Sequence, residues 1–164
     1  MDTYIRTANE RDIPAIQKLL RTTWHATYDA IYGVDRVDAI TKDWHSLTNL
    51  KASLDRPYSE FIVAEGSAGI VGMASASQFD PSYAMLHQLY VLPQTQGQGI
   101  GGDLLQEITE AFPDAKAIRL EVETANTKAV GFYEAAGFAA IDETKNCGNP
   151  ASGIAAIVME RKSR

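Results

Sequence analysis

Hydrophobic and polar residues alternate along this chain with a period that changes from one segment to the next. Residues 4–8 have the pattern of a short strand. After a cap at Asn9 or Asp12, apolar side chains recur at helical spacing, at Ile13, Ile16, Leu20 and Trp24. Three β-rich segments, separated by turn sequences, then span residues 60–65, 70–79 and 84–92. The pattern predicts a strand, a helix and three consecutive antiparallel strands.

The second half of the chain alternates between helical and extended patterns. One helical face carries Leu104, Leu105, Ile108 and Phe112 and stops at Pro113. A strand pattern over residues 117–123 is followed by a helical one over 126–136, closed by Gly137. Residues 138–145 and 154–162 flank a glycine- and proline-containing loop and predict a terminal hairpin. The whole order predicts an α/β (α+β) fold, with a mixed central sheet of about seven strands and helices on both faces.

Residues 22–54 are polar, rich in aromatic side chains and only intermittently periodic. Leu47, Leu50 and Leu54 can line one face of a further helix. Trp24, Tyr28 and Tyr32 also stand at helical spacing. We expect Trp24 to pack in the core. Tyr28 and Tyr32 are candidates for binding a cationic amine, because aromatic faces attract such groups, and packing is the alternative for both.

Length and charge limit the classes of partner. The 164 residues suit one domain over residues 1–164, and 21 acidic against 15 basic side chains give a net charge of -6. No run of Lys or Arg could follow a phosphate backbone, so nucleic acid is not expected, whereas the negative field favours cationic small molecules. The single cysteine, Cys147, the absence of zinc-like spacing, and the absence of a signal or spanning segment predict a cytoplasmic protein without metal or membrane partner. A homodimer is left open.

Four glycines stand within six positions where a strand pattern gives way to a helix: Gly97, Gly99, Gly101 and Gly102. Bare backbone at a helix start gathers N–H groups into a site for anions such as phosphate. A tight turn alone would explain one or two of these glycines. The spacing Gly-x-Gly-x-x-Gly also occurs in dinucleotide-binding folds, but there it opens the first parallel unit. An ATP-type loop would need lysine where Asp103 stands.

These residues resemble the GNAT superfamily of acetyl-CoA-dependent N-acetyltransferases. The family signature Arg/Gln-x-x-Gly-x-Gly/Ala after a strand matches residues 96–101, and its Asn-(x)6-Tyr element followed by Gly-Phe matches Asn126, Tyr133, Gly137 and Phe138. The resemblance covers residues 86–138 and implies acetyl-CoA as co-substrate. It implies cofactor contacts from the strand, from the glycine-rich segment and from the helical segment over residues 126–136. These contacts are expected at Leu89, Tyr90, Val91, Gln96, Gly97, Gln98, Gly99, Ile100, Gly101, Gly102, Asn126 and Tyr133.

Acetyl transfer to an amine needs a neutral nitrogen, a stabilised oxyanion and a proton for the departing thiolate. Tyr133 is the candidate general acid, although packing beside Phe132 is its plain alternative. Met85 stands where many members of the family carry a glutamate, so His87, two residues on, is the candidate base; a structural histidine or a water chain are its alternatives. The backbone near Leu89 is the oxyanion donor that the resemblance implies.

Two acids, Glu121 and Glu123, face either the acceptor or water, and a charged strand face is usually solvated, so neither is a candidate catalytic residue. The expected function is transfer of the acetyl group of acetyl-CoA to an amine of a small molecule or peptide, by direct attack in a ternary complex. The alternative is a non-catalytic module that senses acyl-CoA, and Met85 gives it some weight.

Overall fold

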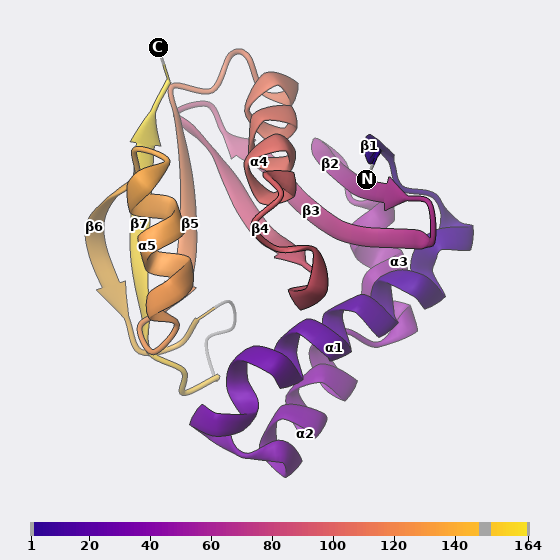
Figure 1. The fold of residues 1–164 in the computed structure, drawn as a ribbon. Helices are drawn as coiled ribbons and strands as arrows, with labels where there is room; N and C mark the ends of the chain where they lie inside the picture. The colour runs from indigo at the N-terminus through magenta and orange to yellow at the C-terminus, as the bar shows by residue number, and fades with distance from the viewer. Residues whose placement is uncertain (1, 148–151, 164) are drawn as a thin grey trace.

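The computed structural model describes residues 2–147 and 152–163, which form a seven-stranded mixed sheet with helices on both faces (Figure 1). The strands are β1 (Tyr4–Thr7), β2 (Ser59–Gly66), β3 (Gly69–Asp80), β4 (Tyr83–Val91), β5 (Ala117–Glu123), β6 (Ala139–Thr144) and β7 (Ala156–Lys162). They lie in the order β1-β2-β3-β4-β5-β7-β6. Only β4 and β5 are parallel neighbours. The predicted fold class is confirmed.

In the described part of the chain, five α-helices cover the sheet: α1 (Ile13–Tyr32), α2 (Val34–Trp44), α3 (Leu47–Asp55), α4 (Ile100–Ala111) and α5 (Thr127–Ala135). Alternate residues of β2 face opposite layers, since a strand turns successive side chains to opposite sides. Ile62 and Ala64 pack in the cluster that contains residues of α4 and α5, whereas Phe61 and Val63 pack with α1 and α3. The sheet therefore buries hydrophobic side chains on both faces.

Residues 22–54 differ from the expected irregular stretch, because they are almost wholly helical. The aromatic segment continues α1 to Tyr32, and Gly33, with φ of 88°, separates it from α2. The predicted face at Leu47 and Leu50 does form α3, but only Leu50 is buried. Polar residues that pack between helices, such as Thr41 in α2, obscured the period.

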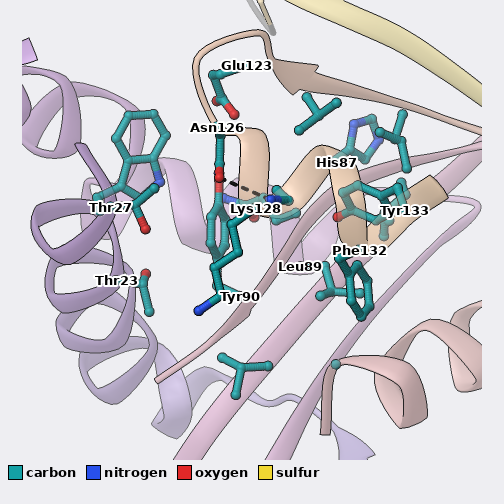
Figure 2. A pocket seen from close by; sticks show the side chains of 18 of the residues that line it. Thr23, Thr27, His87, Leu89, Tyr90, Glu123, Asn126, Lys128, Phe132 and Tyr133 are labelled. Carbon is teal, nitrogen blue, oxygen red and sulfur yellow. Dashed lines mark hydrogen bonds between the residues drawn. The ribbon is translucent and has the colours of Figure 1, made fainter. Parts of the chain in front are cut away.

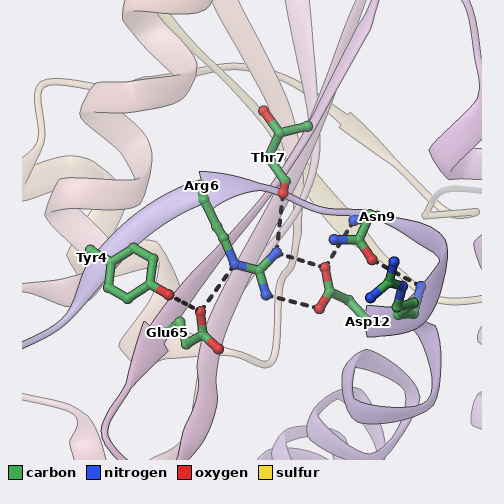
Figure 3. A network of polar contacts seen from close by, with 7 residues as sticks. Tyr4, Arg6, Thr7, Asn9, Asp12 and Glu65 are labelled. Carbon is green, nitrogen blue, oxygen red and sulfur yellow. Dashed lines mark hydrogen bonds and ion pairs between the residues drawn. The ribbon is translucent and has the colours of Figure 1, made fainter.

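A polar network fixes the entry into α1 (Figure 3). The Arg6 guanidinium donates to both oxygens of Asp12 at 2.8 and 2.9 Å and to Glu65 at 3.1 Å, and Tyr4 also bonds to Glu65. Asp12 in turn accepts from the Asn9 backbone N–H at 2.8 Å, which completes a capping box. Arg6 thus ties β1 to β2 and to the first turn before α1.

The two parallel strands separate halfway along their length. Pairing of β4 with β5 ends at Leu86 and Leu120, although β4 runs on to Val91 and β5 to Glu123. The Leu92 N–H donates to Val71 O at 2.8 Å, so the alternation of an antiparallel ladder turns the backbone groups of residues 89 and 91 away from β3 and toward the gap. Figure 1 shows the two strands diverging, with α4 beside one and α5 beside the other.

Candidate active site

A cleft of about 1480 Å³ occupies the place where β4 and β5 diverge. Its walls come from α1, β4, β5, the start of α4 and α5. Most of the residues selected from the sequence line it: Tyr28, His87, Leu89, Tyr90, Val91, Gln96, Gly97, Gly99, Ile100, Gly101, Gly102, Asn126 and Tyr133. Gln98 and Tyr32 do not. The fold therefore brings the predicted donor residues and one of the two predicted acceptor residues to one hollow.

The glycine-rich loop leads directly into α4. Gly97 and Gly99 have φ of 83° and 82°, a conformation that side chains with a Cβ rarely adopt. A Cβ added at Gly97, Gly99 or Gly102 would meet no protein atom within 4 Å, so the surface over these residues is open. The first N–H groups of α4 have no partner inside the helix, which favours an anion there. The loop fits the role of a phosphate cradle.

Lys128, which the sequence analysis did not select, lies at the rim of this loop. Its Nζ donates to Gln96 Oε1 at 2.6 Å and joins the start of α5 to the loop before α4. Gln96 also donates from Nε2 to Val91 O at 3.1 Å. The family resemblance placed Asn126 and the glycines at one site, and Lys128, two residues after Asn126, was the side chain in this segment that the signature did not mark.

Tyr133 reaches the cleft from α5 and is 8 % exposed. Its ring packs edge-on against Phe132 and Phe138, with centroids 5.2 and 5.6 Å away. No hydrogen bond links its hydroxyl to any other group in the described part of the chain. Burial and the nearby charge of Glu123 raise the pKa of Tyr133 well above its ordinary value, so the phenol keeps its proton. Tyr133 therefore packs through its ring and keeps a protonated hydroxyl that can donate a hydrogen bond.

His87 lies on β4 and opens into the cleft beside Met85. Its Nε2 is 2.6 Å from Ser77 Oγ, a hydrogen bond across the β3–β4 pair. The side chain is exposed on the cleft side of the strand, and desolvation by the cleft walls, and then the charge of Arg56, lower the pKa of His87. At neutral pH the imidazole is uncharged and weakly basic, with one nitrogen engaged.

Tyr28, Glu123 and Asn126 form a buried network at the acceptor side of the cleft. The Tyr28 hydroxyl donates to Glu123 Oε2 at 2.6 Å, and Asn126 Nδ2 donates to the same hydroxyl at 3.1 Å. Asn126 Oδ1 also caps α5 by accepting from Ala129 N–H at 3.2 Å. Figure 2 shows Glu123 and Asn126 together on one side of the pocket, with Tyr133 and His87 on the other.

The solvated interpretation of Glu123 is wrong. The side chain is only 7 % exposed, because α1 packs over the end of β5. Burial, followed by negative charge nearby that includes Glu123, raises the pKa of Tyr28 well above its ordinary range. Glu123 also contributes to the raised pKa of Cys147, whose Sγ is 3.9 Å from Glu123 Oε1.

The helices at this side are held by aromatic packing and by a histidine. Trp24 is 1 % exposed, as expected of a core residue, and Tyr28 stacks on Tyr32 with centroids 5.4 Å apart. His25 bridges α1 and α2, with its ring nitrogens 2.6 Å from Asp29 and 2.8 Å from Asp38. Burial lowers the pKa of His25, but the two carboxylates outweigh it and the net change is upward.

His45, at the end of α2, also borders the cleft and was not selected from the sequence. It is 3 % exposed, and its Nδ1 has no hydrogen-bond partner among the residues described. Burial lowers the pKa of His45 to about 4. This imidazole is therefore neutral at physiological pH.

The described ranges, 2–147 and 152–163, contain neither a metal-binding group of side chains nor a helix that could cross a membrane. No group of three or more His, Cys, Asp and Glu residues is arranged to hold a metal ion, and no helix there has the length and apolar character needed to cross a membrane.

Comparison with known proteins gives the same picture as the geometry. The model of the acetyltransferase (GNAT) family matches residues 13–138. A probable N-acetyltransferase of Mycobacterium tuberculosis, Rv2775, is 31% identical over 157 residues, which cover 92% of this chain and 87% of that protein. An uncharacterised protein of Mycobacterium leprae is 33% identical over 101 residues, or 62% of this chain, but this segment is only 28% of that longer protein.

Among solved structures, the PaiA N-acetyltransferase of Thermoplasma acidophilum, crystallised in complex with coenzyme A, shares the fold. The TM-score is 0.87 at 23% identity, with 99% of this chain and 100% of that chain covered. A family match over most of the chain, and a cleft lined by the motif residues, confirm the acyltransferase class and the acetyl-CoA donor expected from the sequence, and the chain belongs to the acetyltransferase (GNAT) family.

Proposed function

We propose that this enzyme acetylates a primary amine of a small molecule or a peptide by direct attack of the amine on acetyl-CoA, with both substrates bound in the cleft. The observation that carries the proposal is the open backbone of β4 leading into the glycine loop, with the Tyr133 hydroxyl in the same hollow. A donor held along that edge would place its thioester between the two diverging strands.

The residues around the loop fit the phosphates of coenzyme A. The amides at the start of α4 supply hydrogen-bond donors, the open surface over Gly97, Gly99 and Gly102 leaves room for the group, and Lys128 adds a positive charge. The backbone N–H and C=O of residue 89 and the N–H of residue 91 point toward the gap, where an extended pantetheine arm would pair with them as an added strand. Acetyl-CoA supplies the activated acetyl group.

Three groups of the chain would serve the reaction. The backbone N–H of residue 89 is an oxyanion donor, because it faces the gap without a strand partner. Tyr133 is the general acid for the departing thiolate, since its phenol is protonated and free to donate. Asn126, predicted to contact the donor, holds Tyr28 and the start of α5 in place.

Direct transfer is favoured over an acetylated enzyme by the state of the cysteine. Cys147, the single cysteine of the chain, borders the cleft. Burial first, and then the charges of Glu123 and Glu121, raise the pKa of its thiol well above the ordinary value. A thiol that stays protonated is a poor nucleophile, so the amine itself is the better candidate for attack.

His87 as general base makes a distinct prediction about pH. A base with a pKa of about 4 gives a rate that falls only below about pH 4, where the imidazole gains its proton. The acid limb of kcat/KM should therefore lie near pH 4 and shift or disappear in His87→Gln. Ser77→Ala, which removes only the hydroxyl partner, serves as the control. An acid limb near pH 6.5, or one unchanged in His87→Gln, assigns the base role to water or to another residue.

The proposed function is tested by mixing the protein with acetyl-CoA and a panel of amines, following thiol release and identifying products by mass. We expect an acetylated amine, and initial rates that vary with both substrate concentrations as intersecting lines, as a ternary complex requires. Parallel lines would indicate an acetylated enzyme. Tight coenzyme A binding with no turnover on any amine would favour the sensor alternative.

A further inference from the structure

Glu123 is a buried carboxylate at the end of β5 without a cationic partner. It is 7 % exposed, and within residues 2–147 and 152–163 no Lys, Arg or His nitrogen lies within ion-pair distance of it. Among the residues that the structure describes, its Oε2 accepts one hydrogen bond from the Tyr28 hydroxyl, and its Oε1 has only the Cys147 thiol, 3.9 Å away. Within the described residues, the Cys147 thiol, a weak donor, is therefore the strongest hydrogen-bond partner of Glu123 Oε1.

Burying a carboxylate in this way is costly unless a cation or several donors compensate. Nearby basic side chains are engaged elsewhere: Lys128 bonds to Gln96, and Arg36 lies over the Tyr32 ring, 5.0 Å from its centroid. Glu121, half-buried on the same face of β5, also borders the cleft, but the missing compensation concerns Glu123 alone. The site is thus electrostatically incomplete in a way that a positive ligand would complete.

The position of Glu123 connects this charge with the reaction centre. Glu123 lines the same cleft as Tyr133, and its charge is felt at that phenol, whose pKa it helps to raise. The aromatic rings of Trp24 and Tyr28, both lining the cleft and 4.4 Å apart by centroid, border the acceptor side. Both rings are 1 % exposed and pack on one another, so they form the wall of the site, and the carboxylate supplies the charge that an ammonium ion needs.

From this placement we infer that Glu123, held by the Tyr28 hydroxyl, binds the protonated amine of the acceptor and selects cationic alkylamines over amines that are neutral at pH 7. The inference rests on the proposed acetyl transfer and names its acceptor class. Tyr28 is a positioning residue, because it fixes one carboxylate oxygen and leaves the other to the ligand. Recognition of the ammonium ion is separate from its deprotonation, so the residue should act on KM for the amine.

The test uses the whole chain loaded with coenzyme A, which lacks the acetyl group and cannot react. Calorimetry measures binding of primary n-alkylamines, from propylamine to hexylamine, each paired with the n-alcohol of equal length. We expect wild-type protein to prefer the amine to its alcohol, and Glu123→Gln to bind the amine about 10- to 100-fold more weakly with alcohol binding unchanged. Glu143→Gln, the same charge change on exposed β6, should match wild type.

Steady-state kinetics complete the test. In Glu123→Gln, KM for the amine should rise by the same factor, while KM for acetyl-CoA and the pH profile of kcat stay as in wild type. The melting temperature should hold or rise, because an uncompensated buried charge is removed. If Glu123→Gln does not fold, the preference of wild-type protein for the amine over the alcohol still tests whether the ammonium site exists.

Three outcomes overturn the inference. Equal binding of amine and alcohol by wild type removes the ammonium site. Unchanged amine affinity in Glu123→Gln removes Glu123 from it. A fall in kcat with KM unchanged assigns Glu123 to proton removal instead of binding. Loss of coenzyme A binding in wild type would instead contradict the proposed function, so the two failures are distinguishable.

Discussion

The donor side and the acceptor side of the cleft are built in different ways. On the donor side, main chain forms the surface: the glycines before α4 and the open edge of β4. On the acceptor side, side chains from distant segments form it, as where Tyr28 of α1 meets Glu123, 95 positions away. A backbone surface suits a ligand that is the same for a whole family, whereas a side-chain surface can change with each acceptor.

This difference has an electrostatic counterpart. The donor side offers helix N–H groups and Lys128, which attract phosphate. The acceptor side offers Glu123 and Glu121 beside aromatic rings, which favour a cation. The two substrates of an acetyl transfer to an amine have these opposite charges, so the cleft is complementary to both.

The largest expected effect is a fall in kcat when Tyr133, which lines the cleft between the two sides, is changed. Tyr133→Phe removes only the hydroxyl and keeps the packing against Phe132 and Phe138. We expect kcat to fall about 100- to 10,000-fold, the usual contribution of a general acid, with coenzyme A affinity within about twofold of wild type. Tyr58→Phe, at an exposed tyrosine, is the control. A Tyr133→Phe enzyme at full rate would reduce Tyr133 to a packing residue.

A second prediction concerns stability, because His45 on the acceptor side is a buried neutral imidazole. The pKa of His45 is about 4 in the folded chain and near 6.5 when unfolded, so between these values the unfolded state binds more protons. The free energy of unfolding should fall by up to about 3 kcal/mol as pH drops from 6.5 to 4.

Denaturant titrations of wild type and His45→Gln across this range measure the effect, since the carboxylates titrate in both proteins and cancel in the difference. Hydrogen exchange should locate the loss in α1–α3 before α4. Identical pH dependence in the two proteins would show that His45 takes up its proton while folded without cost.

The smallest expected effect is on coenzyme A affinity, when a single methyl group is added on the donor side. Gly102→Ala and Gly131→Ala lie within α4 and α5, where an added Cβ meets no protein atom, so each should stabilise the fold by about 0.5–1 kcal/mol. Only Gly102 lines the cleft. Coenzyme A should therefore bind several-fold more weakly to Gly102→Ala and unchanged to Gly131→Ala. Equal affinities would mean that the cradle does not approach Gly102.

The sequence by itself determined the order of the elements and the donor motif. The strand bounds of β5 agree residue for residue with the alternating pattern, and the other strands agree within two residues, because local periodicity reports which side of a strand is buried. The glycines before α4 and the spacing of Asn126 and Tyr133 are equally local, since they lie in one loop and along one helix. Such features depend on residues a few positions away, so the sequence alone predicts them.

The acceptor side was decided by the tertiary structure. The alternation in β5 left Glu123 facing either the acceptor or water, and the contact with Tyr28 of α1 in the tertiary structure shows that the carboxylate is buried. His45 and Cys147 came to the cleft in the same way, from segments with no pattern linking them to it. Burial of a charge depends on what covers it, and in this fold the cover comes from the opposite end of the chain, beyond the reach of local periodicity.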